Sequence, residues 1–110
     1  MATTEGYFIY IKDQLSQMEY ISYKKMMGEY LIYYKGKYIA AICDDRLMIR
    51  DFKDAENYLK SIKYEKPYEG AKDMLLVETD AGIQFYRELF EAAFEKLPAV
   101  RSKSNKKEKV

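Results

Sequence analysis

The stretch Glu29-Tyr-Leu-Ile-Tyr-Tyr-Lys-Gly-Lys-Tyr-Ile-Ala-Ala-Ile-Cys43 decides the fold of this 110-residue chain. It is rich in Tyr, Ile and Leu on both sides of Lys35-Gly36, as expected of two β-strands joined by a two-residue turn. Gly36 would occupy the second turn position, where a positive φ is needed. The stretch therefore predicts an antiparallel hairpin of residues 29–34 and 37–43. The predicted register places Tyr34 opposite Lys37, Tyr33 opposite Tyr38 and Ile32 opposite Ile39.

The predicted hairpin has large apolar side chains on both of its faces, because side chains alternate along a strand. One face would carry Leu31, Tyr33, Tyr38, Ala40 and Ile42, and the other Tyr30, Ile32, Tyr34, Ile39 and Ala41. A single layer of helices covers only one face, so we expect a second copy of the chain to cover the other. The candidate dimer face, drawn from both faces, consists of Tyr30, Ile32, Tyr33, Tyr38, Ile39 and Ile42.

The segments on either side of the hairpin show clear periodicities. An apolar stripe at three- and four-residue spacing predicts a first helix over residues 4–17, capped by Thr3 or Thr4. Residues 20–23 predict the start of a strand, and Asp44-Asp45 predicts a turn before a strand at 46–50. The first stripe is formed by Phe8, Ile11, Leu15 and Met18.

The second half of the chain predicts a short helix, a loop, a strand and a final helix. The short helix would span residues 53–61, with Asp51 as its N-cap, and the loop residues 64–73. The apolar run 74–77 predicts a buried strand. The final helix would be capped by Thr79 or Asp80 and ended by Pro98. Its stripe, the strongest in the chain, is Tyr86, Leu89, Phe90, Ala93, Phe94 and Leu97.

These elements predict an α+β fold in two layers, in which helices pack on an antiparallel sheet of about five strands, in the order α-β-β-β-β-α-β-α. We expect one domain over residues 1–98 and a disordered basic tail over residues 99–110. The first 98 residues hold 14 Lys and Arg against 17 Asp and Glu, whereas the last 12 hold five basic residues against one acidic residue. An acidic body with a basic tail is not typical of a dedicated nucleic-acid-binding domain.

Two short phrases flank the hairpin and carry a family resemblance. They are Met26-Met27-Gly28-Glu29-Tyr30 and Pro67-Tyr68-Glu69-Gly70-Ala71-Lys72. Together with the Gly36-Lys37 turn and the Arg46-Leu47 strand start, they resemble the N-terminal domain of the TfoX/Sxy competence regulators. The resemblance covers nearly the whole chain up to Pro98 and implies a small α+β domain. It attaches no catalytic residue to these positions. We expect a standalone N-terminal-domain protein without the second domain of the full-length regulators.

The composition gives little support for an enzyme. Histidine, the usual general base and the commonest metal ligand, is absent, and the only cysteine is Cys43. We therefore expect no catalytic residue, no metal and no cofactor, and we interpret Cys43 as a core or edge residue of the sheet. A single cysteine fits a reducing compartment, so we expect a cytoplasmic protein. No apolar run is long enough to cross a membrane.

Two groups of residues could nevertheless bind something. The loop residues Tyr68, Glu69, Gly70 and Lys72 form a candidate interaction site. Alternatively, Glu69 and Lys72 fasten the loop to the sheet, with Tyr68 packed on the core. The 12 tyrosines suit either stacking on nucleic-acid bases or a half-wet protein interface. The candidate nucleic-acid contacts are Lys24, Lys25, Lys35, Lys37, Arg101, Lys103, Lys106 and Lys107.

The sequence thus leaves three functional hypotheses, in order of preference. The first is a non-enzymatic, homodimeric interaction module in transcription or competence-type regulation, whose other partners would be a transcription regulator or an RNA polymerase component. The second is direct binding of nucleic acid through the basic tail and a Lys/Tyr surface. The third is a small-molecule binder or enzyme at the loop 68–72.

Overall fold

The computed structural model describes residues 3–98 as an α+β domain in two layers, as the sequence predicts. Helix α1 (Glu5–Gln14) precedes four strands that follow one another closely, and helix α2 (Ile83–Lys96) ends the domain. The strands are β1 (Ile21–Met26), β2 (Glu29–Tyr34), β3 (Lys37–Cys43), β4 (Arg46–Arg50), β5 (Tyr64–Glu65) and β6 (Met74–Leu76). The predicted tail, with Arg101, Lys103, Lys106 and Lys107, lies outside the described residues.

The first four strands are joined by three two-residue turns, each with a positive φ at both central residues. These pairs are Met27-Gly28, Lys35-Gly36 and Asp44-Asp45, with φ between 51° and 85°. Two positive φ angles define the type I′ turn, whose twist matches that of the flanking strands. The chain therefore folds β1 to β4 as consecutive hairpins, and the predictions for Gly36 and for the Asp44-Asp45 turn are confirmed.

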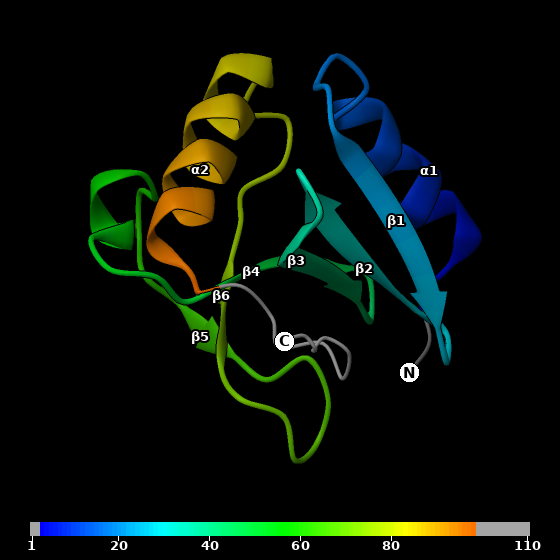
Figure 1. Ribbon diagram of the computed structural model, residues 1–110. Coiled ribbons are helices and arrows are strands. Elements are labelled where there is room, and N and C mark those ends of the chain that lie inside the picture. The colour runs from blue at the N-terminus through cyan, green and yellow to red at the C-terminus, as the bar shows by residue number, and fades with distance from the viewer. Residues whose placement is uncertain (1–2, 99–110) are drawn as a thin grey trace, which may run out of the picture.

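All six strands belong to one antiparallel sheet, in the order β1-β2-β3-β4-β6-β5. Both helices lie on one face of this sheet, and the loop that precedes β6 lies on the other (Figure 1). We call the face without helices the open face. The sheet thus has a thick core on one side and a thin cluster on the other, formed by Ala41, Cys43, Met48 and Met74.

The predicted register holds next to the turn but is wrong beyond it. Tyr33 lies opposite Tyr38 as expected, but a bulge at Ile32/Tyr33 places Ile32 opposite Ala40 instead of Ile39. One extra residue reverses the faces of everything that follows it. Ala40 and Ile42 consequently join the core under the helices, whereas Ala41 turns to the open face.

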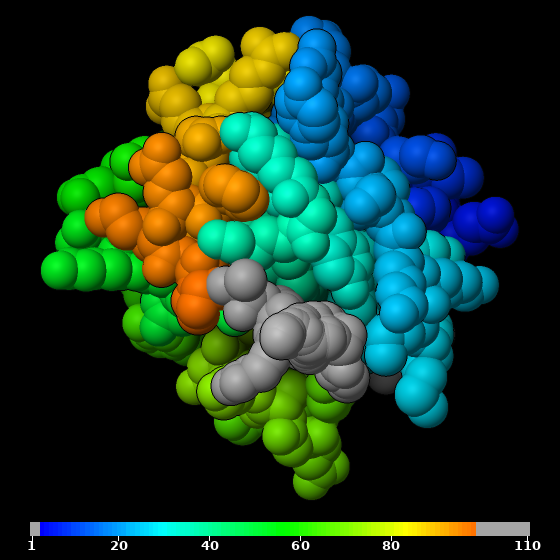
Figure 2. All heavy atoms as spheres, in the orientation of Figure 1, coloured from blue at the N-terminus to red at the C-terminus, as the bar shows by residue number. Residues whose placement is uncertain are grey.

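The core under the helices is built by the predicted stripes. Ile11 of α1, Leu15 at its C-cap, and Leu89, Phe90 and Ala93 of α2 are buried with the inner sheet residues. Leu75 and Val77 belong to the same cluster, and Phe8, Met18 and Phe94 pack against it. In Figure 2 the last turns of α2 lie directly against the β2–β3 turn.

The bounds and caps of the two helices differ in part from the prediction. Thr4 does cap α1, because its hydroxyl accepts a hydrogen bond from the backbone N–H of Tyr7, but the helix is shorter than predicted. Helix α2 begins after Gly82 and has no side-chain cap, so Thr79 and Asp80 do not cap it. Asp80 instead accepts hydrogen bonds from Tyr10 and Gln14, joining the loop before α2 to α1.

The segment between β4 and β6 also differs from the prediction. In place of a helix over 53–61 there is a single 3₁₀ turn, Ala55–Asn57, and it follows Asp54 rather than Asp51. Ala55 and Leu59 are buried, but Tyr58 and Ile62 are each 38% exposed, so the segment has no continuous helical stripe. The predicted loop 64–73 begins with the two-residue strand β5, paired with β6.

The type I′ geometry at Gly36 leads to a first testable prediction. Gly36 has a φ of +81°, and no atom lies within 4 Å of the place where a Cβ would stand. We therefore expect Gly36→Ala to lower the free energy of unfolding by about 1 kcal/mol through backbone strain alone. Urea titration measures the loss.

Gly6 provides the matched control for this substitution. It lies in α1, is equally open and has no positive φ, so Gly6→Ala should stabilise the domain by roughly 0.5–1 kcal/mol. The same change of side chain should thus give opposite signs at the two sites. Equal stability of Gly36→Ala and the parent would show that this turn is not strained.

Candidate binding groove on the open face

Loop 66–73 is held across the open face by two side chains. Arg46, at the start of β4, forms an ion pair with Glu65 and donates hydrogen bonds to the backbone oxygens of Lys66 and Pro67. The Lys66 ammonium spans the loop, with its Nζ 3.4 Å from the oxygen of Ala71 and 3.2 Å from the Asp73 carboxylate. The loop is therefore fastened at its start and closed on itself at its end.

A groove of about 780 Å³ lies between this loop and the open face. Most of its wall is apolar, and the exposed thioether of Met27 stands at its mouth. This size and lining are typical of sites that bind small ligands or side chains of a partner. Its lining residues are Met26, Met27, Glu29, Leu31, Tyr38, Ala41, Cys43, Arg50, Pro67, Tyr68, Gly70, Ala71, Lys72 and Met74.

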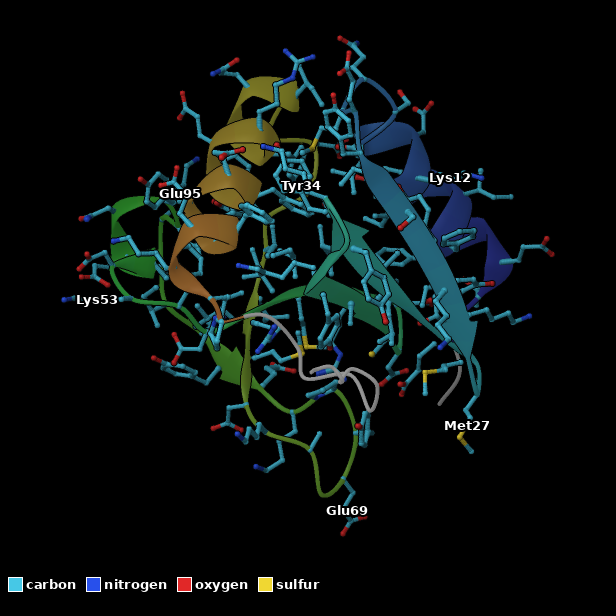
Figure 3. All side chains as sticks on the ribbon, in the orientation of Figure 1. Lys12, Met27, Tyr34, Lys53, Glu69 and Glu95 are labelled. Atoms are coloured by element: carbon cyan, nitrogen blue, oxygen red, sulfur yellow. The ribbon has the colours of Figure 1, made fainter. Side chains whose placement is uncertain are left out.

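The structure brings three of the four predicted loop residues to this groove. Tyr68, Gly70 and Lys72 line it, whereas Glu69, at the tip of the loop, points away from the sheet (Figure 3). The alternative prediction, in which Glu69 and Lys72 fasten the loop to the sheet, is wrong. Tyr68 is 58% exposed rather than packed on the core, and no bond from Glu69 or Lys72 to the sheet is found among the described residues. Arg46 and Lys66, which sequence reasoning missed, fasten the loop.

The two ends of the groove carry opposite charges. At one end the Arg50 guanidinium donates a hydrogen bond of 2.8 Å to the backbone oxygen of Tyr38 and lies over the Tyr38 ring, 5.3 Å from its centroid. At the other end Glu29 lies beside Cys43. Burial, and secondarily the Glu29 carboxylate, raises the pKa of the Cys43 thiol to about 12. Cys43 is therefore an unreactive neutral thiol near pH 7, as its interpretation as a core residue requires.

The candidate dimer face is divided between the two sides of the sheet. Tyr30, Ile32, Ile39 and Ile42 are buried in the core under the helices, so they are not available to a partner. The stacking of Phe8 on Tyr30, with ring centroids 3.8 Å apart, shows how closely α1 covers this side. Only Tyr33 and Tyr38 remain, half-buried on the open face, with ring centroids 6.0 Å apart.

The four lysines of the predicted nucleic-acid surface do not form one surface. Lys37 donates hydrogen bonds to the backbone oxygens of Phe94 and Leu97 and so satisfies the end of α2. Lys35 pairs with Glu91 at 3.2 Å. Lys24 and Lys25 are exposed neighbours on β1, so their side chains leave opposite faces of the sheet.

Lys35 belongs to a small polar cluster beside α2. The Tyr34 hydroxyl donates a hydrogen bond of 2.8 Å to the Glu91 carboxylate, and this bond, with Lys35, lowers the pKa of Glu91. The cluster thus uses the charge of Lys35 to join the β2–β3 turn to α2. A phosphate group would have to compete with Glu91 for this lysine.

Neither a metal-binding cluster nor a membrane-spanning helix is found within residues 3–98. No three carboxylate or thiol side chains are placed to hold a metal ion, and no helix is long and apolar enough to cross a membrane.

The fold and the groove define the class of protein. It is a small two-layer α+β domain with an open sheet face that is partly covered by a loop. Comparison with known proteins then shows the family. A model of the TfoX N-terminal domain matches residues 13–104, and the chain belongs to this family.

One curated relative is similar over part of the chain. It is an uncharacterised 12.7 kDa protein encoded in the region 5′ of trpE in Spirochaeta aurantia, 29% identical over 73 residues. The match covers 66% of this chain and 64% of the relative, so the chain spans less than two thirds of that protein's length. No solved structure matches the chain.

Proposed function

We propose that this protein is a non-enzymatic interaction module that acts as a homodimer through protein–protein contacts. One observation carries the proposal: the β1–β2 half of the open face presents apolar side chains, some of which also line the groove. Leu31 and Tyr33 are half-buried there, Met26 is 45% exposed and Met27 is 96% exposed. We call these four residues the dimer patch. An apolar patch on a sheet, next to a protruding methionine, supports a contact with a second protein surface.

A second copy is the occupant that needs the fewest assumptions, because a two-fold contact requires only one self-complementary patch. Tyr33 and Tyr38 suit the margin of such an interface, since each has an apolar ring and a polar tip. Family membership supports a role in transcription or competence-type regulation, and the single cysteine, Cys43, supports a cytoplasmic location.

The alternative function, nucleic-acid binding, receives less support from the described residues. Lys35 and Lys37 are engaged by α2, which leaves Lys24 and Lys25 on opposite faces of an edge strand. Nucleic-acid binding would then depend on the basic tail, where Arg101, Lys103, Lys106 and Lys107 lie outside the described residues. A steep salt dependence of DNA binding that disappears on truncation after Pro98 would favour this alternative.

Sedimentation at micromolar concentration tests the homodimer. We expect a mass about twice the 13.1 kDa of the chain. We expect Tyr33→Lys to halve this mass, because a charge introduced into an apolar contact opposes association. Tyr20→Lys is the matched control, since Tyr20 is 67% exposed and lies outside the dimer patch; it should stay dimeric.

A parent protein that sediments as a monomer would contradict the homodimer. The dimer patch would then be left for a hetero-partner, such as a transcription regulator or an RNA polymerase component. Equal dimerisation of parent and Tyr33→Lys would instead move the contact to another surface.

A further inference from the structure

We infer that the groove on the open face is a binding site for a small amphipathic monocarboxylic acid, with the carboxylate at Arg50 and the apolar body along β3. This inference goes beyond the proposed interaction module and does not depend on self-association. The groove shares Met26, Met27 and Leu31 with the dimer patch. Arg50 lies outside the patch and Tyr33 outside the groove, so variants of these two residues measure the two properties separately.

The two arginines of β4 show why Arg50 is the anchor. Arg46 and Arg50 lie four residues apart in the same strand, so both leave the open face. Arg46 is fully used: it bonds Glu65 and the backbone oxygens of Cys43, Lys66 and Pro67. Arg50 is half-buried, and its one hydrogen bond within residues 3–98 goes to a neutral backbone oxygen.

The charge of Arg50 is therefore not compensated within the described domain. No carboxylate of residues 3–98 forms a salt bridge with it, although five other cations have one. A guanidinium has five N–H donors in a planar fork that matches a carboxylate, and removing its charge from water without a partner is unfavourable. An anionic group in the groove would complete this site, and Lys72 on the loop adds a second positive charge.

The rest of the groove determines what the anion must be attached to. Its floor, formed by Ala41, Cys43 and Met74, is at most 5% exposed and carries no charge near pH 7. Tyr38 and Cys43 stand five residues apart on β3, which corresponds to a length of about 16 Å. An extended apolar chain, rather than a polar or compact metabolite, fits such a floor.

The far end of the groove limits the ligand to a single carboxylate. Glu29 lines the groove there, beside Cys43, and a second acidic group at that end would face its charge. Opposite charges at the two ends therefore fix one orientation, with the head at Arg50 and the apolar end toward Met26 and Cys43. A dicarboxylate of similar length is disfavoured by like-charge repulsion.

Isothermal titration calorimetry with decanoate, 1-decanol and decanedioate tests this inference on the full chain. We expect decanoate to bind with a Kd on the order of 0.1 mM, which small ligands of this size can reach. We expect at least ten-fold weaker binding of both 1-decanol, which lacks the charge, and decanedioate, which places a second charge at Glu29. The sedimentation experiment is run separately, so loss of the dimer and loss of binding are told apart.

Variants locate the head group and the groove. Arg50→Met should weaken decanoate at least ten-fold, whereas Arg87→Met, an exposed arginine on α2, should leave it unchanged. Ala71→Trp, in the loop that roofs the groove, should abolish binding without unfolding the domain, because Ala71 is outside the core. Arg50→Lys keeps the positive charge and should retain part of the affinity for decanoate. It replaces Arg50→Met in this test if Arg50→Met does not fold.

Several results would overturn the inference. They are undetectable decanoate binding at millimolar concentration, equal affinity for decanoate and 1-decanol, equal affinity for decanedioate, and equal losses in Arg50→Met and Arg87→Met. The first would show that the groove takes no such ligand. The others would show binding without recognition at Arg50 or Glu29.

Discussion

Phe90→Ala is expected to lower the free energy of unfolding by about 3–5 kcal/mol, a large share of the roughly 5–15 kcal/mol that stabilises a domain. Phe90 is fully buried in α2, and its ring meets that of Tyr34 edge-on, with centroids 6.2 Å apart. Truncation therefore removes buried apolar surface and leaves a cavity between helix and sheet. Urea unfolding followed by circular dichroism measures the loss.

Ile9→Ala provides the control for this truncation. Ile9 is 57% exposed on α1, so removing its side chain should change stability by less than about 0.5 kcal/mol. If Phe90→Ala unfolds at the same urea concentration as Ile9→Ala, α2 is not docked on the sheet as described. A loss confined to Phe90→Ala shows that the second helix contributes a main part of the core.

The sequence predicts the fold well where local chemistry acts alone. Asp44-Asp45 and Lys35-Gly36 each form turns because Asp and Gly tolerate positive φ. Helix α2 forms where its apolar stripe predicts it. The bulge at Ile32/Tyr33 could not be predicted, since it arises from the twist of two paired strands and no Gly or Pro marks it. The extra residue at this bulge, Ile39, reversed the predicted faces of the β3 residues that follow it.

The short helix predicted over 53–61 failed for a different reason. Ala55 and Leu59 have helical spacing, but the chain must return to the sheet as β5 by Tyr64. Tertiary pairing therefore outweighed a weak local preference, and only the 3₁₀ turn remained. Propensity alone does not reveal such competition.

Only some of the residues that form the groove could be predicted from the sequence. The loop 68–72 was identified because of its Gly and its charges, but Arg46 and Arg50 were not. A signal for them exists: in Arg46-Leu-Met-Ile-Arg50, alternation places both arginines on the face of Met48, at the two ends of an otherwise apolar strand. A charge on an apolar strand face needs a partner. What the sequence could not show is that loop 66–73 satisfies Arg46 and leaves Arg50 for the groove.

Alkaline pH is expected to destabilise the domain steeply between about pH 9 and pH 12. Burial raises the pKa of the Cys43 thiol from its ordinary 9.0 to about 12, and those of the Tyr23 and Tyr38 hydroxyls from 10.0 to about 12. Through this window the unfolded chain loses these protons at lower pH than the folded domain does. The unfolded state therefore gains the stabilisation of ionisation, and stability falls as pH rises.

The size of the effect follows from the number of groups. Each group contributes a slope of at most about 1.4 kcal/mol per pH unit while it is ionised only in the unfolded state. Tyr23 and Tyr38 are only partly buried, which lowers their share, so the three groups together stay below about 4 kcal/mol per unit. Burial also raises the pKa of Tyr86, whose hydroxyl donates to the backbone oxygen of Glu78, and this adds to the slope in the same direction.

Urea midpoints from pH 8 to 11, together with the tyrosinate absorbance at each pH, measure this dependence. Tyr38→Phe removes one of the three groups and should reduce the slope by up to about a third, since the weak contact of its hydroxyl with the Met74 sulfur, 4.0 Å away, adds little. Tyr20→Phe, at an exposed position, should leave the slope unchanged. If Tyr38→Phe and Tyr20→Phe show the same slope as the parent, the Tyr38 hydroxyl ionises as readily in the folded domain as in the unfolded chain. The open face at Tyr38, beside the Arg50 end of the groove, would then be wetter than its burial indicates.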